Sequence, residues 1–396
     1  MTATTPPTPT SPRAWTMLAL GVGAQAAGTL VVTAPALLIP SLHADGTPLP
    51  VAGLLAAAPT FGMVLTLIAW GAITDRIGER VVIAGGLALT TIAAVGAWAA
   101  AGDPVLLGLA FLAGGMTSAS TNAASGRVVV GWFPKERRGL AMGIRQMSQP
   151  LGVTLAALTV PQLAEASSIR AALVLPVVLC AVLAVCCAVG ITDPPRPARA
   201  AVATVPANPY RSDGFLWQVH AVSVLLVVPQ FTLSTYGLVW LVGLGWSTPA
   251  AGFLVGASQF VGAVGRILVG VWSDRVGSRV GPLRVVAVGA AAVMGLLALV
   301  DVTHLAAGAV FLVIATSVTV ADNGLAYTSV AEAAGPYWSG RALGAQNTGQ
   351  FIAASAVGPG VGALVTTVGF AASFGIVAVL PLLALPLVPR VDRSSD

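Results

Sequence analysis

The sequence has 396 residues, of which 56 % are hydrophobic and only 8 % are charged. Soluble globular chains carry about 25 % charged residues, so this composition excludes an ordinary water-soluble fold and indicates a surface that faces lipid. The net charge of +5 would suggest nucleic-acid binding in a soluble protein. Here the basic residues occupy short loops between apolar runs, so the excess is interpreted as a signal of membrane topology.

The apolar runs are long enough to cross a bilayer, because a spanning helix needs about 20 mostly apolar residues. The alternating pattern of membrane strands is absent from the sequence. We therefore predict an all-α membrane protein with twelve transmembrane helices. In chain order the runs are 14–39, 51–73, 81–101, 105–130, 139–163, 170–191, 215–243, 250–272, 282–301, 305–330, 341–366 and 370–389.

Polar segments divide these runs into two sets of six. Residues 1–13 are rich in Thr and Pro and predict a disordered tail. The proline-rich segment 192–214 predicts a cytoplasmic linker between one six-helix bundle at 14–191 and a second at 215–389, and residues 390–396 predict a cytoplasmic tail. The first apolar run is too long for the core of a signal peptide, so it is interpreted as the first spanning helix.

The placement of arginine and lysine predicts the orientation in the membrane. With a cytoplasmic N-terminus, fifteen of these residues lie on the cytoplasmic side and only Arg170 lies outside. The remaining Arg127, Arg145 and Arg266 lie within predicted helices. Because basic residues concentrate on the cytoplasmic side of membrane proteins, we predict a multi-pass protein of the cell inner (cytoplasmic) membrane with both termini in the cytoplasm.

The two halves contain a repeated loop. Five positions after the second run recur after the eighth run, 199 residues later. The positions are Gly71, Asp75, Arg76, Gly78 and Arg80 in the first copy, and Gly270, Asp274, Arg275, Gly277 and Arg279 in the second. A repeat at half the chain length predicts two six-helix bundles related by duplication, a known plan of transporters.

This loop resembles the Gly-x-x-x-Asp-Arg-x-Gly-x-Arg signature of the major facilitator superfamily, and residues 131–143 resemble the family's connection between helices 4 and 5. The resemblance covers essentially the whole chain. It implies the family fold of two pseudo-symmetric six-helix bundles and a gating role for the ten signature residues. From the residues alone, Asp75 or Asp274 can face the N-terminus of a neighbouring helix or pair with an arginine. The alternative is that the signature only fixes the orientation of the loops.

Two charged residues inside predicted helices suggest a site, because a charge near the bilayer centre costs at least about 2.5 kcal/mol. Arg266 lies about 12 Å from the cytoplasmic end of its helix at 1.5 Å per residue, and its planar guanidinium suits a carboxylate. The alternative is a structural ion pair. Asp322 is the acid in the interior of a predicted span and can pair with Arg266. Protonation of Asp322 would then release Arg266 for an anion, which makes Asp322 a candidate proton-coupling residue; a structural role is the alternative.

Other polar side chains in the predicted helices complete the candidate site. Arg145 and Gln149 lie one turn apart, and Gln350 follows Gln149 by 201 residues. Arg145 can instead extend to the surface or brace the neighbouring loop. Helices 1 and 7 supply Gln25, Gln230 and Tyr236. The predicted substrate-binding set is Arg266, Gln149, Gln350, Asn347, Gln25, Asn323, Tyr236 and Arg145.

These features predict a secondary transporter that works by alternating access. The sequence contains no P-loop pattern for nucleotide binding. We therefore expect an ion gradient, most often a proton gradient in this family, to drive transport. The interior arginines favour an anion such as a monocarboxylate, and residues 131–143 and 265–266 are similar to organic-anion and cyanate-type members of the superfamily. We expect a monomer in the lipid bilayer, with a small-molecule substrate and protons as partners, no cofactor, no metal, no catalytic residues and no nucleic acid.

Two alternatives remain open. The first is a proton-coupled pump for drugs or metabolites, although the Gly-x-x-x-Gly-Pro-x-x-Gly-Gly pattern typical of helix 5 in such exporters is absent. The second is a membrane enzyme or a transport-like sensor. A membrane enzyme needs clustered His, acid or Cys residues, and the three histidines are scattered along the sequence. A sensor of this kind usually adds a large soluble domain, which the sequence lacks.

Overall fold

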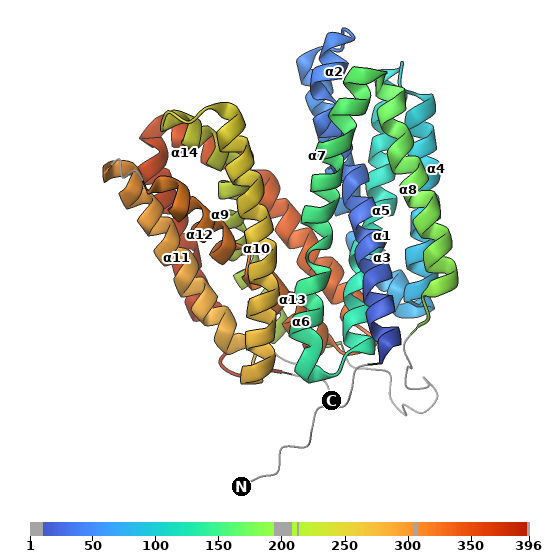
Figure 1. Ribbon diagram of the computed structural model, residues 1–396. Helices are drawn as coiled ribbons and strands as arrows, with labels where there is room; N and C mark the ends of the chain where they lie inside the picture. The colour runs from blue at the N-terminus through green and yellow to red at the C-terminus, as the bar shows by residue number, and fades with distance from the viewer. Residues whose placement is uncertain (1–10, 194–207, 212–213, 304–306, 394–396) are drawn as a thin grey trace. The chain divides into compact units, whose positions relative to one another are not determined.

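The computed structural model describes residues 11–193, 208–211, 214–303 and 307–393. The predicted N-terminal tail at 1–13 and linker at 192–214 therefore lie mostly outside the described residues, as does part of the tail at 390–396. Within the described ranges the chain is helical (Figure 1). Its helices are α1 (Pro12–Leu37), α2 (Ile39–Ala44), α3 (Leu49–Ile77), α4 (Glu79–Ala99), α5 (Pro104–Trp132), α6 (Lys135–Arg145), α7 (Ser148–Ala166), α8 (Ile169–Gly190), α9 (Phe215–Gly243), α10 (Thr248–Val276), α11 (Val280–Thr303), α12 (Gly308–Thr319), α13 (Asp322–Ala334), α14 (Ser339–Ala384) and the short 3₁₀ turn η2 (Leu385–Leu387).

Ten segments of the described chain are long and apolar enough to cross a membrane. The predicted runs differ from these segments in two places. The run 139–163 is divided between α6 and α7, because the helix is interrupted around residues 146–147. The runs 341–366 and 370–389 form the single element α14, which contains a non-helical residue at Gly369 with φ 79°. This positive φ suits glycine and marks the turn between the two runs.

Large apolar side chains cover much of the helical surface. Val189 and Phe253 are each 79 % exposed, and Leu54 is 72 % exposed. Soluble proteins seldom expose extended apolar surface. These outward-facing residues are therefore the lipid-facing surface that the low charge content predicted.

The chain forms two compact units. Unit 1 comprises residues 1–136, 147–206 and 336–347. In it α5 packs against α1, α3 and α4, and α8 packs against α1, α4 and α7 (Figure 1). Its segment 336–347 contains the first turns of α14, so this unit includes a piece of chain from the second half of the sequence.

Unit 2 comprises residues 137–146, 207–335 and 348–396. In it α12 packs against α9, α10 and α11, and α13 packs against α9, α10 and α11. Its buried core includes Trp240, whose indole nitrogen donates to Asp301 Oδ1 at 2.7 Å and whose ring packs edge-on against Phe374. Segment 137–146 brings most of α6, from the first half of the sequence, into this unit.

Candidate functional site

Asp75 of the first signature copy lies at the end of α3 and caps the start of α14. Its carboxylate accepts hydrogen bonds from the backbone N–H groups of Gly340 at 2.8 Å and Arg341 at 3.0 Å. Arg127 Nη1 donates to the same carboxylate at 2.7 Å, and Arg127 Nε lies 2.8 Å from Glu79 Oε1 in a second ion pair. The side chains of Arg127 and Asp75 are only 4 % and 1 % exposed. Asp75 thus combines a helix cap with a buried ion pair, the two contacts that the sequence suggested for it.

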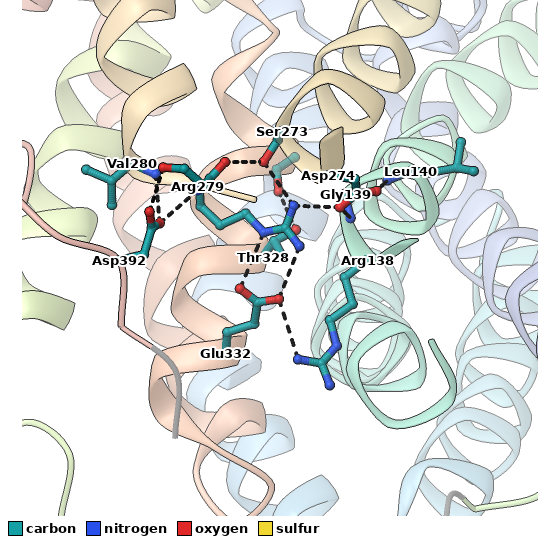
Figure 2. Close-up of polar contacts among 12 residues, drawn as sticks. Arg138, Gly139, Leu140, Ser273, Asp274, Arg279, Val280, Thr328, Glu332 and Asp392 are labelled. Atoms are coloured by element: carbon teal, nitrogen blue, oxygen red, sulfur yellow. Dashed lines mark hydrogen bonds and ion pairs between the residues drawn. The ribbon is translucent and has the colours of Figure 1, made fainter. Parts of the chain in front are cut away.

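Asp274 of the second copy makes the equivalent contacts in unit 2. It accepts from the backbone N–H groups of Gly139 and Leu140 in α6, each at 2.9 Å (Figure 2). Arg279 Nη1 donates to Asp274 at 2.6 Å, and Arg279 Nη2 lies 3.3 Å from Glu332. Burial lowers the pKa of Arg279, but Glu332 and Asp274 more than compensate and raise it above its ordinary value. Arg279 is therefore charged at every physiological pH.

The two networks have the same layout, but the positions of the acid and the base are swapped between them. In unit 1 the acid Glu79 begins α4 and pairs with the base Arg127 of α5. In unit 2 the base Arg279 precedes α11 and pairs with the acid Glu332 of α13 (Figure 2). In each network a buried arginine, Arg127 or Arg279, pairs with the signature aspartate and with a second acid. Glu79 and Glu332 were not identified from the sequence, although the arginine inside the fourth predicted helix indicated that a partner acid was needed.

A second pair of aspartates repeats at the same spacing and caps the helices that follow each signature. Arg80 N donates to Asp193 at 2.9 Å, and Arg279 N donates to Asp392 at 2.8 Å. Asp392 follows Asp193 by 199 residues. Acceptors at helix N-termini stabilise the unpaired N–H groups there, so these caps fix the start of α4 and of α11.

The remaining signature residues differ in exposure. Arg76 and Arg275 are exposed. Arg80 is also exposed, and its Nε donates to the carbonyl oxygen of Ala188 at 2.8 Å. Gly78 and Gly277 both have positive φ, 106° and 68°, which a side chain would oppose.

Two signature glycines allow close backbone contact. A Cβ atom added to Gly71 would lie 2.6 Å from the carbonyl carbon of Gly340, in the segment that Asp75 caps. A Cβ atom added to Gly270 would lie 2.6 Å from the carbonyl carbon of Gly139, in the segment that Asp274 caps. The glycine contact and the aspartate cap thus hold the same helix end in each unit.

A buried polar cluster in unit 2 contains several predicted site residues. Arg266 is 5 % exposed; its Nε donates to the carbonyl oxygen of Val320 at 3.2 Å and its Nη1 donates to that of Gln146 at 3.1 Å. Arg266 forms no ion pair with an acid in the described ranges. Backbone carbonyls hold this guanidinium in place, and its positive charge remains uncompensated by direct contact.

Asp322 lies in the first turn of α13 and is 1 % exposed. Neither of its carboxylate oxygens accepts a well-formed hydrogen bond from a side chain or backbone group that the structure describes. It is close enough to Arg266 for their charges to interact, but the direct pair considered in the sequence analysis is not formed. Among the described residues, Arg266 and the N-terminus of α13 would stabilise a negative charge here.

Gln350 joins three helices of the cluster. Its Nε2 donates to Ser223 Oγ of α9 at 2.6 Å and to Asn323 Oδ1 of α13 at 2.9 Å, and its Oε1 accepts from Tyr327 at 2.8 Å. Asn323 Nδ2 in turn donates to Gln230 Oε1 at 2.8 Å. The structure thus brings Gln350, Asn323 and Gln230 together, all three of which the sequence suggested, and adds Ser223 and Tyr327.

Arg145 joins the same cluster from α6. Its guanidinium carbon lies 5.3 Å from the centre of the Tyr327 ring, and its Nη1 donates to Gln146 Oε1 at 3.1 Å. The side chain is almost fully buried. It therefore does not extend to the surface, which was one of the alternatives for this residue.

The other predicted site residues lie elsewhere. Gln25, in unit 1, donates to Asn122 at 3.5 Å and accepts from Ser125 at 2.9 Å. Asn347, also in unit 1, donates to the carbonyl oxygen of Leu343 in its own helix. Tyr236 donates to the carbonyl oxygen of Gly358. Gln149 is half-buried in unit 1.

Asn122 and Ser125 were not identified from the sequence. They lie in the stretch Ser118–Ser125 of α5, in which small and polar residues are all buried. An apolar run interrupted by consecutive Ser, Thr and Asn residues was a signal that could have identified them, because polar groups inside a membrane need partners.

Comparisons with known proteins agree with this architecture. A family model described as Major Facilitator Superfamily matches residues 16–359. The MFS-type transporter Rv2994 of Mycobacterium tuberculosis (strain ATCC 25618 / H37Rv) is 46 % identical over 378 residues, which are 95 % of this chain and 84 % of that protein.

Solved structures show the same fold at low sequence identity. The proton:xylose symporter XylE bound to 6-bromo-6-deoxy-D-glucose has a TM-score of 0.78 at 15 % identity, covering 96 % of this chain and 97 % of its own. The human organic anion transporter MFSD10 (TETRAN) has a TM-score of 0.72 at 18 % identity, covering 96 % and 100 %. The chain is therefore a multi-pass membrane protein with the twelve-span, two-domain fold, and it belongs to the Major Facilitator Superfamily of secondary transporters.

Proposed function

We propose that this transporter moves a small organic anion, such as a monocarboxylate, across the cytoplasmic membrane by alternating access. The observation that carries the proposal is Arg266, a buried guanidinium that two backbone carbonyls hold and that no acid within the described residues contacts directly. A buried charge without a charged partner is costly, and an anionic substrate supplies that partner. Arg145 lies in the same cluster, bonded to the residue whose carbonyl holds Arg266.

Substitution of Arg266 by alanine is expected to abolish stabilisation of the purified protein by carboxylates. The measurement is the unfolding temperature in detergent with acetate, pyruvate, benzoate, neutral sugars or cationic dyes. The Arg390→Ala variant changes an exposed arginine of the same unit that is outside the signature, and it should shift with carboxylates as the wild type does. Stabilisation of the wild type by cationic dyes alone would contradict the proposal.

Asp322 is the proposed proton-coupling residue. It is the acidic side chain that interacts electrostatically with Arg266, and its oxygens lack well-formed hydrogen bonds within the described residues. A proton on Asp322 removes the negative charge that competes with the substrate for Arg266. Binding of the anion and of the proton would then favour each other, as coupled transport requires.

Asp322→Asn is expected to uncouple uptake from the proton gradient, because the amide cannot exchange a proton in the physiological range. In proteoliposomes, an inside-alkaline gradient should raise carboxylate uptake several-fold for the wild type and leave it unchanged for the variant. Glu165→Gln changes an exposed acid and should retain the wild-type response. An Asp322→Asn protein that still responds fully to the gradient would exclude this role.

The signature residues are the proposed gate. Asp75 caps a helix from the second half of the sequence, and Asp274 caps one from the first half. Movement of the halves during alternating access would break both caps, so these contacts would favour one state of the transporter. The same residues would serve in the alternative function, efflux of drugs or metabolites, which no contact in the cluster favours specifically.

A further inference from the structure

A chain of hydrogen bonds runs through the polar cluster of unit 2 in one direction. The Tyr327 hydroxyl donates to Gln350 Oε1, Gln350 Nε2 donates to Asn323 Oδ1, and Asn323 Nδ2 donates to Gln230 Oε1. The three distances are 2.8, 2.9 and 2.8 Å. In Gln350 and in Asn323, the amide oxygen therefore accepts from the preceding residue of the chain, and the amide nitrogen donates to the following one.

Arg145 lies beside the start of this chain and favours its direction. Its guanidinium lies over the Tyr327 ring at 5.3 Å, and a cation at this position withdraws electron density from the ring. The phenol is therefore a stronger donor than acceptor, and Gln350 presents its oxygen to it. Ser223 accepts the second N–H of Gln350 at 2.6 Å, which leaves Gln350 with both donors already engaged.

The chain ends at Gln230 of α9. This side chain is half-buried, whereas Tyr327, Gln350 and Asn323 are buried. Its oxygen accepts from Asn323, but its Nε2 donates to no residue that the structure describes. Hydrogen bonds in a chain polarise one another, so acceptance at the oxygen makes the two N–H groups of Gln230 better donors.

We propose that Gln230 is a specificity-determining residue that donates its N–H groups to an acceptor oxygen of the transported anion. Gln350 and Asn323, which the sequence suggested as substrate contacts, are instead positioning residues that orient Gln230. The proposal rests on the anion transport proposed above. It predicts preference for substrates whose oxygens are acceptors only, as in a carboxylate.

Two variants of Gln230 test this role. Gln230→Glu keeps an oxygen for Asn323 but replaces the N–H donors, and Gln230→Met removes the donors without adding charge. Gln218 is exposed on the same helix, so Gln218→Glu and Gln218→Met are the matched controls. The readout is the apparent affinity for whichever of acetate, pyruvate and benzoate stabilises the wild type most in detergent, with size-exclusion chromatography to confirm that each variant is folded.

Both Gln230 variants are expected to weaken binding at least about tenfold, as loss of a hydrogen bond to a charged group does, while the Gln218 variants match the wild type. If only Gln230→Glu weakened binding, the cause would be charge repulsion and the proposal would be overturned. It would also be overturned if neither Gln230 variant weakened binding. Loss of binding in Arg266→Ala with full binding in Gln230→Met would leave anion transport standing and remove Gln230 from the site. A wild type that binds none of the three carboxylates would overturn both proposals.

Discussion

Asp75→Asn is expected to destabilise the protein by about 3 kcal/mol and to abolish most transport. Removal of one partner from a buried ion pair leaves the other charge uncompensated, which costs about 3–5 kcal/mol. Arg127 keeps its contact with Glu79, so the lower end of this range applies. The substitution also weakens the cap on the N–H groups of Gly340 and Arg341.

Chemical unfolding in detergent and uptake by proteoliposomes measure the two effects. Asp45→Asn, in an exposed position, should change stability by less than about 0.5 kcal/mol. A double-mutant cycle with Arg127→Gln should give a coupling energy of about 0.5–3 kcal/mol. If Asp75→Asn matched Asp45→Asn in stability and transport, the buried pair would have no part in either.

Gly71→Ala and Gly270→Ala are each expected to destabilise the protein by at least about 1–3 kcal/mol, the usual cost of overpacking. The added methyl group meets the backbone of Gly340 or Gly139 and not the end of a flexible side chain. Relief therefore requires displacement of a whole helix end, together with the residues that Asp75 or Asp274 caps.

Gly85→Ala and Gly295→Ala are the matched controls for this pair. Both glycines lie within helices, and a Cβ atom there meets nothing within 4 Å. Alanine favours a helix over glycine by about 0.5–1 kcal/mol, so these variants should unfold at or above the wild-type temperature. Equal unfolding temperatures for Gly71→Ala and Gly85→Ala would mean that the close backbone contact does not restrict the structure.

The helical membrane fold was predictable from the sequence because hydropathy is a strong constraint. A membrane span must hydrogen-bond its backbone groups internally and present apolar side chains to lipid. A sufficiently long apolar run therefore predicts a transmembrane helix. The interruption between α6 and α7 had a local signal that was not used, because Pro150 has no N–H to donate to the carbonyl of Gln146 four residues earlier. There the carbonyl of Gln146 accepts from Arg266 of α10, a tertiary contact that no local pattern reports.

The site was predictable in its residue types but not in their roles. Arg266, Asp322 and Gln350 were identified because a polar side chain in an apolar run is costly unless it has a partner or a function. Their partners depend on which helix faces which, so the sequence left open a direct pair between Arg266 and Asp322 that is not formed. Gln350 was interpreted as a substrate contact, whereas both of its N–H groups are engaged within the protein.

Counterflow in proteoliposomes tests the proposed anion site most directly. Vesicles loaded with unlabelled carboxylate and diluted into labelled carboxylate should accumulate label through the wild type, and Arg266→Ala should reduce this exchange to the level of empty vesicles. Exchange of carboxylate that persists in Arg266→Ala would contradict the account, as would a wild type that exchanges only neutral or cationic compounds.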